Sequence, residues 1–331
     1  MPFRVEGSLT PLGMVLAKAL TLLGPKTGRL LAKDLAENGG RAIANGKPIV
    51  VIQLCYTMIK IIAFPWRYGC FFGFWDAWRK KIFRKRSIKV MESLLSKKPV
   101  PVRERLIFAL DYPDIGEARK IIEILGDSVQ FYKLGLEIFM ADGYFKLVDE
   151  LNKKGKKVFV DLKFFDVPNT VASAVRQLKD HNAEFVTVHG SDKILEAACN
   201  AKSGVKILAV TVLTSLCQED IDSLGFQGVK VEDLVYSRAK RALEIGCDGV
   251  ISSGLEIARL RKSLGDKLLI VVPGIRPVEN TEIDDQKRTV NVETAFKNGA
   301  DYIVVGRPIK KAPDPRQAAE DIQYSIAKIF E

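Results

Sequence analysis

Acidic and basic side chains alternate in one short segment of this chain, 161-DLKFFDVPNT-170. Alternate residues of a β-strand face the same way, so a strand ending here would bring Asp161 and Lys163 to one side, with Asp166 just past its end. A lysine between two carboxylates keeps its proton, because nearby opposite charges favour its charged form. The same spacing is also typical of an ion-pair cluster that only caps a strand.

Three more polar residues follow or interrupt apolar runs. Asp111 ends 105-RLIFALD-111, Lys133 lies within 130-QFYKLGL-136, and Thr214 follows the apolar part of 206-KILAVTVL-213. If these runs are neighbouring parallel strands, their polar residues meet at one edge of the sheet. Lys133 could then join Asp161 and Lys163 in a network of alternating charge.

Arginine and glycine occur near the last two apolar runs. Arg276 lies in 273-PGIRP-277, and Gly306 and Arg307 lie in 306-GRPI-309. The loops after strands seven and eight of a (β/α)8 barrel often bind phosphate, and the arginine fork suits bidentate contact with it. The long polar segment 276-RPVENTEIDDQKR-288 suits a lid that closes over such a group. Together these features favour a phosphorylated substrate.

Short β-branched runs alternate with segments of helical period from residue 105 onward. This alternation predicts buried parallel strands, and eight of them close most naturally into an α/β (β/α)8 TIM barrel with its active site at the strand ends. A doubly wound open sheet is the alternative, although no G-x-G-x-x-G turn follows the first strand. The predicted strands are 105–111, 130–136, 157–164, 185–190, 206–213, 248–253, 268–274 and 301–306, with helical stretches that include 115–125, 144–154, 170–180, 235–245, 292–298 and 315–330.

The first hundred residues differ from the rest in charge. They contain 18 Lys and Arg against 5 Asp and Glu, whereas the whole chain contains 51 against 40, so the net charge of +11 lies entirely in this part. We expect residues 1–98 to be a basic, aromatic-rich, mostly helical extension, residues 99–104 a linker, and residues 105–331 the barrel. An anionic membrane surface is one partner for such a segment, and a solvated, solubilising face is the other interpretation.

Residues 48–86 hold an apolar stretch, all three tryptophans and then a basic run at Arg79–Arg86. This order is typical of a membrane–water interface. Lys60 and Arg67 interrupt the apolar residues, whereas a spanning helix needs about 20 in succession. An interfacial segment, a soluble helical domain and a spanning helix all stay open as interpretations. We expect no nucleic-acid partner.

The five cysteines are widely spaced and the chain has only two histidines, so no zinc pattern can be built. No secretory signal is evident, and we expect a reducing cytoplasm, with peripheral membrane association through the extension as a further expectation. The overall composition, 47% hydrophobic and 27% charged, is that of a globular protein.

Residues 105–330 resemble the orotidine 5′-phosphate decarboxylase family. The D-x-K-x-x-D element is shared with a wider suprafamily, but the whole segment 161–170, combined with PGIRP and GRPI, is far more specific. The sequence departs from the family at Asp284-Asp285, where Gly-Asp is expected before Gln286. The matching motifs are LD (Asp111), KLG (Lys133), DLKFFDVPNT (Asp161–Thr170), VTVLTS (Thr214), PGIRP (Arg276), DQ-x-R (Gln286) and VVGRPI (Gly306 and Arg307).

The resemblance implies an enzyme that converts orotidine 5′-phosphate (OMP) to UMP and CO2 with no metal and no organic cofactor. Lys163 would protonate C6 of the pyrimidine, Asp161 would lie beside the substrate carboxylate, and Lys133 would orient the network. In a homodimer, Asp166 and Thr170 would reach the partner's active site. The implied substrate-binding residues are Asp111 for the ribose, Thr214 for the pyrimidine, and Arg276, Gln286, Gly306 and Arg307 for the phosphate and the lid.

Two other functions stay open. A sugar-phosphate decarboxylase or hexulose-phosphate synthase of the same suprafamily would share D-x-K-x-x-D but typically use a magnesium ion. A protein that acts mainly through residues 1–100 as a binding module would carry the barrel as a passenger. Sensitivity to a chelator would identify the first. Salt-dependent binding of anionic liposomes by the full chain, but not by a chain that starts near Pro101, would favour the second.

Overall fold

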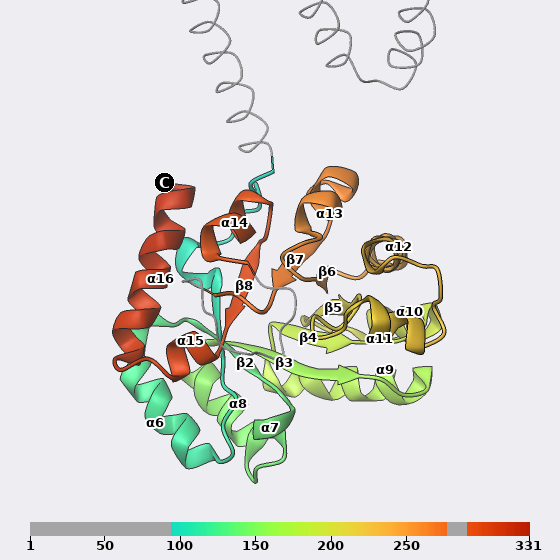
Figure 1. Ribbon diagram of the computed structural model, residues 1–331. Coiled ribbons are helices and arrows are strands. Elements are labelled where there is room, and N and C mark those ends of the chain that lie inside the picture. Colours follow the sequence, from blue (N-terminus) through green and yellow to red (C-terminus); the bar gives the residue numbers. More distant parts are fainter. Residues whose placement is uncertain (1–93, 277–289) are drawn as a thin grey trace, which may run out of the picture. The chain divides into compact units, whose positions relative to one another are not determined.

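The computed structural model describes residues 94–276 and 290–331, which form a barrel surrounded by helices (Figure 1). The expectations for residues 1–93, the membrane-interfacial segment among them, lie outside the described residues, as do those for Gln286 and most of the lid. Within the described ranges, no helix is both long and apolar enough to cross a membrane.

Eight parallel strands follow one another in chain order around a closed barrel, and the first pairs with the last. This closure confirms the predicted TIM barrel and rules out the open sheet. All strands except β3 end one to three residues earlier than predicted, because their last residues leave the ladder at the barrel mouth. The strands are β1 (Leu106–Ala109), β2 (Phe131–Leu134), β3 (Lys157–Phe164), β4 (Phe185–Val188), β5 (Lys206–Val210), β6 (Gly249–Ile251), β7 (Leu269–Val272) and β8 (Tyr302–Val305).

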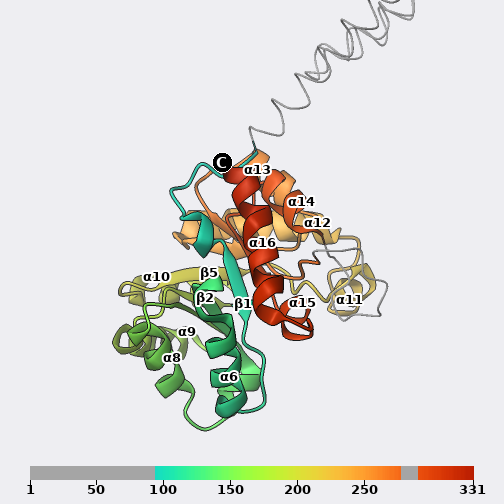
Figure 2. The same cartoon turned by 90° about the vertical axis from the view of Figure 1, so that its left-hand side faces the viewer.

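Helices connect successive strands and cover the outside of the barrel. Asp114 and Asp314 cap the first and last of the long helices, each accepting a hydrogen bond from a backbone amide three residues ahead. The last helix packs beside the first, which completes the ring (Figures 1 and 2). The helices are α6 (Ile115–Leu125), α7 (Leu136–Phe139), α8 (Tyr144–Lys153), α9 (Pro168–Gln177), α10 (Asp192–Ala201), α11 (Gln218–Ser223), α12 (Val231–Ile245), α13 (Ile257–Leu264), α14 (Val292–Lys297), α15 (Arg307–Lys310) and α16 (Pro315–Phe330), with 3-10 turns η2 (Val102–Glu104), η3 (Gly126–Ser128) and η4 (Leu178–His181).

The core has two layers, one between the strands and the helices and one inside the barrel. Four rings fill the interior, from Phe131, Phe159, Phe185 and Tyr302. They meet mostly edge to face, with centroids 5.1–5.9 Å apart. The packed rings leave the barrel interior without a channel, so polar chemistry is confined to its ends.

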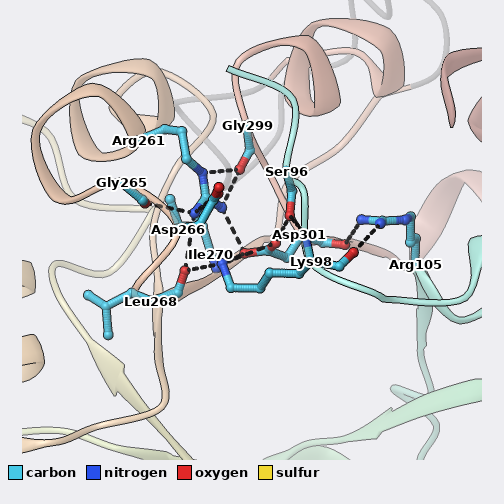
Figure 3. A network of polar contacts seen from close by, with 10 residues as sticks. All are labelled: Ser96, Lys98, Arg105, Arg261, Gly265, Asp266, Leu268, Ile270, Gly299 and Asp301. Carbon is cyan, nitrogen blue, oxygen red and sulfur yellow. Dashed lines mark hydrogen bonds and ion pairs between the residues drawn. The ribbon is translucent and has the colours of Figure 1, made fainter. Parts of the chain in front are cut away.

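The amino-terminal end of the barrel is closed by a polar network around Asp301 (Figure 3). The Arg261 guanidinium lies 2.8 Å from this carboxylate, and both side chains are almost completely buried. Lys98 lies 3.3 Å from Asp301 and donates to the Leu268 carbonyl at 2.8 Å, while the Ser96 hydroxyl also bonds Asp301. The chain that leads into the barrel is therefore fixed to the end remote from the carboxyl ends of the strands.

Candidate active site

A cavity of about 330 Å³ opens at the carboxyl ends of the strands. Its floor is apolar and its rim is charged, because the strands change from β-branched to polar residues as they leave the barrel. The predicted site residues that line it are Asp111, Lys133, Asp161, Lys163, Thr214, Arg276, Gly306 and Arg307.

Four side chains on three neighbouring strand ends form a row of alternating charge. The Lys133 ammonium lies 3.2 Å from Asp111 and 3.4 Å from Asp161. On the other side of Asp161, the Lys163 ammonium donates a hydrogen bond to Oδ1 at 3.0 Å. Lys133 and Asp161 are 13% and 12% exposed, whereas Lys163 is 35% exposed and therefore more accessible from the cavity.

Charge pairing dominates burial at the centre of this row. Burial alone would raise the pKa of Asp161, but the ammonium groups of Lys133 and Lys163 hold that pKa below its usual value. Burial alone would lower the pKa of Lys133, but the carboxylates of Asp161 and Asp111 raise that pKa above its usual value. Both groups therefore carry their charge at neutral pH.

Strand β3 is irregular where it carries these residues. Val160 pairs with Val186 and Phe164 pairs with Val188, so three residues of β3 lie opposite one residue of β4. Lys163, the last of the three, has φ of 49°, in the left-handed region that a lysine rarely adopts. A bulge of this kind redirects side chains, and bulges are common beside active sites. Here it lets Asp161 and Lys163 meet above the ladder.

Basic and small residues occupy the opposite side of the rim. Arg276 follows β7, and Gly306 and Arg307 follow β8. A Cβ atom at Gly306 would lie 3.3 Å from the Cβ atom of Ala109, which is tighter than most such contacts. The glycine thus lets the two strand ends approach closely beside Arg307, which also lines the cavity.

Asp166 and Thr170 do not line this cavity, and both are exposed on the surface of the chain. Asp166 instead accepts a hydrogen bond from the Val167 amide at 2.6 Å. Gln286 lies outside the described residues. Of the eleven predicted site residues, the structure thus brings eight together, separates two from them, and does not describe the last.

Sequence reasoning missed Thr187, which is fully buried beneath the charged row. Its hydroxyl donates to Asp161 Oδ1 at 2.9 Å and accepts from the Lys163 amide at 2.9 Å. The signal in the sequence was slight: one threonine within the apolar run 185-FVTV-188. The apolar lining was also not predicted, and it includes Phe159, Val210, Ile251 and Val304.

The cavity can bind a polar molecule that carries an anionic group. Apolar side chains offer the floor, arginines lie on one side, and an ammonium supported by two carboxylates lies on the other. Within residues 94–276 and 290–331, no group of three or more His, Cys, Asp and Glu side chains is arranged to hold a metal ion. The chemistry that the side chains themselves offer is stabilisation of negative charge followed by protonation.

Comparison with known proteins gives a consistent result. The profile of the "Orotidine 5′-phosphate decarboxylase / HUMPS family" matches residues 104–322. The orotidine 5′-phosphate decarboxylase of Methylococcus capsulatus is 59% identical over 240 residues, covering 72% of this chain and 99% of that protein. That of Stenotrophomonas maltophilia is 48% identical over 237 residues, covering 70% and 98%. The crystal structure of the enzyme from Lactobacillus acidophilus superposes with a TM-score of 0.60 at 35% identity, covering 67% of this chain and 99% of that one.

Proposed function

The chain belongs to the orotidine 5′-phosphate decarboxylase family, and from this premise we propose how its barrel converts OMP to UMP and CO2, a carboxy-lyase reaction of pyrimidine nucleotide synthesis. We propose a direct decarboxylation in which Lys163 protonates C6 of the pyrimidine. The observation that carries this proposal is the row Asp111–Lys133–Asp161–Lys163. Of its two ammonium groups, that of Lys163 is the more accessible from the cavity. The proposed chemistry uses no metal ion and no organic cofactor.

The difficult step is the loss of CO2, because it leaves an electron pair on C6 with little resonance stabilisation. The Lys163 ammonium is held beside Asp161 at 3.0 Å and can face this developing charge. A fixed cation already in place stabilises the charge without reorganisation of solvent. The same ammonium then transfers a proton to C6, which forms the C–H bond of UMP and leaves the amine neutral until water reprotonates it.

Asp161 and Lys133 have supporting roles in this proposal. Asp161 would lie beside the carboxylate that departs as CO2 and would also keep Lys163 oriented. Lys133 lies between Asp111 and Asp161, so it orients both carboxylates, and it would contact the ribose. Asp111, whose side chain is 44% exposed, can accept hydrogen bonds from ribose hydroxyls. Thr214 would contact the pyrimidine from the β5 side of the cavity.

The phosphate would bind on the opposite side of the rim. We assign Arg307, Gly306 and Arg276 to this group, with Gln286 from the loop that follows Arg276. Binding energy from a phosphate far from C6 can hold the base in its reactive position and close the loop over it. This division leaves the reacting carbon facing the lysine, the phosphate facing the arginines, and the apolar floor against the flat face of the base.

We propose that two chains form a homodimer in which Asp166 and Thr170 enter the partner's cavity. Both residues are exposed on the surface of a single chain. Asp166 is flanked by Phe165 and Val167, which are 68% and 62% exposed. Large apolar side chains that leave this much surface exposed on one loop support an interface with another molecule. A second copy would cover them and place another carboxylate beside Lys163.

We further propose that the basic extension binds an anionic membrane surface through residues 48–86, so that a cytoplasmic enzyme associates peripherally. The support is compositional: tryptophans followed directly by a run of Lys and Arg. The test is sedimentation with anionic vesicles of the full chain and of a variant with Arg79, Lys80, Lys81, Arg84, Lys85 and Arg86 changed to Gln. We expect the variant to lose salt-sensitive binding. Equal binding by both chains, or none by either, would contradict the proposal.

The decarboxylase proposal is tested by the loss of OMP absorbance in the presence of EDTA, with Lys163→Ala as the comparison. We expect turnover that survives the chelator and falls by about 10⁴-fold in the variant, the upper end of what a proton donor contributes. Activity that EDTA abolishes would favour the magnesium-dependent members of the suprafamily. No turnover of OMP by the folded wild-type chain would refute the proposal.

A further inference from the structure

Thr187 lies on β4 with its side chain directed into the barrel. The neighbouring residues Val186 and Val188 pack outward against the helices, while Phe185 packs inward, so the alternation of the strand turns Thr187 inward as well. It lies above the aromatic layer and has no exposed surface. A valine would fill the same volume in these surroundings, so the hydroxyl is the feature that needs an explanation.

Both hydrogen bonds of this hydroxyl go to residues of the proposed catalytic row. It donates to Oδ1 of Asp161 and accepts from the backbone amide of Lys163, each at 2.9 Å. Oδ1 is also the atom that accepts from the Lys163 ammonium. The Thr187 hydroxyl therefore contacts both Asp161 and Lys163, the first and last of the three β3 residues that form the bulge.

The bulge explains why this contact is required. Three residues of β3 face Thr187 alone, so the Lys163 amide has no ladder partner on β4. A left-handed backbone is strained in a residue with a side chain and persists only where the surroundings hold it. The Thr187 hydroxyl supplies the missing acceptor for the Lys163 amide and fixes the carboxylate beside it.

We infer that Thr187 is a positioning residue, which sets the direction of the Lys163 ammonium by holding both the Lys163 backbone and the Asp161 carboxylate. Thr187 does not line the cavity and so acts only through these two residues. The inference rests on the proposed decarboxylase function and adds to it a residue that does not touch the substrate.

The experiment compares Thr187→Val, which keeps the volume, with Thr187→Ser, which keeps the hydroxyl. Thr211→Val is the matched control, because Thr211 is also buried, directly after β5, and its hydroxyl donates to the Ile251 carbonyl at 2.8 Å, away from the row. Steady-state kinetics with OMP and peptide-resolved hydrogen exchange at the Lys163 amide are measured on all chains, together with the melting temperature.

We expect Thr187→Val to lower kcat about 10- to 100-fold with KM within about threefold, as a small misplacement of a catalytic group does. We expect the Lys163 amide to exchange faster in this variant alone, and Thr187→Ser and Thr211→Val to stay near wild type in both measurements. Thr187→Val with wild-type kcat or unchanged exchange at Lys163 would overturn the inference, as would equal losses in the Val and Ser variants. If the wild-type chain does not decarboxylate OMP but the exchange differs as expected, the proposed function fails while the positioning contact stands.

Discussion

The Nζ atom of Lys163 lies 3.0 Å from Oδ1 of Asp161, although only one residue separates them and the second has a left-handed backbone. Neighbouring inward positions of a regular strand would place these side chains in parallel. The bulge instead turns the ammonium back onto the carboxylate, so the two side chains form one ion-paired unit. Substitutions of either residue should therefore affect the geometry of both.

Asp161→Asn tests the electrostatics of this unit. At pH 7 we expect the free energy of unfolding to fall by about 3 kcal/mol, because two ammonium groups lose their shared counter-ion in a buried place. Since the folded protein lowers the pKa of Asp161, its stabilisation is present above the unfolded-state pKa of about 3.9 and is lost as the pH falls below about 4. Urea unfolding of both proteins between pH 3 and pH 7 measures the difference. If the difference in unfolding free energy between the wild type and Asp161→Asn grew toward acid pH, Asp161 would not have the lowered pKa described here.

Arg307→Ala tests the phosphate side of the cavity. We expect KM for OMP to rise about 10- to 100-fold, because a charge-assisted hydrogen bond contributes about 1.5–3 kcal/mol. Arg316→Ala removes a similar charge from an exposed position at the start of α16 and should leave KM unchanged. Orotidine, which lacks the phosphate, is the second substrate. With orotidine, the effect of Arg307→Ala on KM should disappear. An equal rise in KM with OMP and with orotidine would show that Arg307 does not bind the phosphate.

Mixing two inactive variants tests the shared site. Lys163→Ala and Asp166→Ala should each have little activity as separate homodimers. In a hybrid dimer, one cavity has both substitutions and the other has neither, so activity should recover toward about a quarter of the wild-type value after subunit exchange. Size-exclusion chromatography confirms that dimers persist. If no activity returns although hybrids form, Asp166 does not enter the partner's cavity.

Asp301→Ala tests the closed end of the barrel. This change leaves the Arg261 guanidinium buried without its carboxylate, and we expect a loss of about 3–5 kcal/mol in the free energy of unfolding. The control is Asp233→Ala, which breaks the exposed pair with Arg259 and should cost about 1 kcal/mol or less. Chemical denaturation measures both. Similar small losses in the two variants would show that the buried network contributes little.

The barrel was predictable because its physical signals are local. Apolar strands and amphipathic helices alternate along the chain, and parallel strands bring their polar ends to one rim whatever the details of the loops. The bulge in β3 was not predictable, because lysine is not among the residues enriched at positive φ. Thr187 was not predicted for a related reason. Threonine is common in strands, and its role becomes evident only once the bulge opposite it in β3 is known. The spacing of Asp166 from Lys163 does not indicate that Asp166 is exposed; only the family resemblance, which implies a role in the partner's active site, suggests a position on the surface.

The contacts of Ser96 and Lys98 with Asp301 have a mechanical consequence. A force that pulls on the chain at residue 94 would pass through these contacts to the beginnings of β7 and β8, which Lys98 bridges through Leu268 and Asp301. The catalytic row lies at the opposite ends of the strands, on β1, β2 and β3. If the protein is immobilised by its first residues, the resulting strain should therefore fall on the amino-terminal end of the barrel and leave the position of Lys163 unchanged.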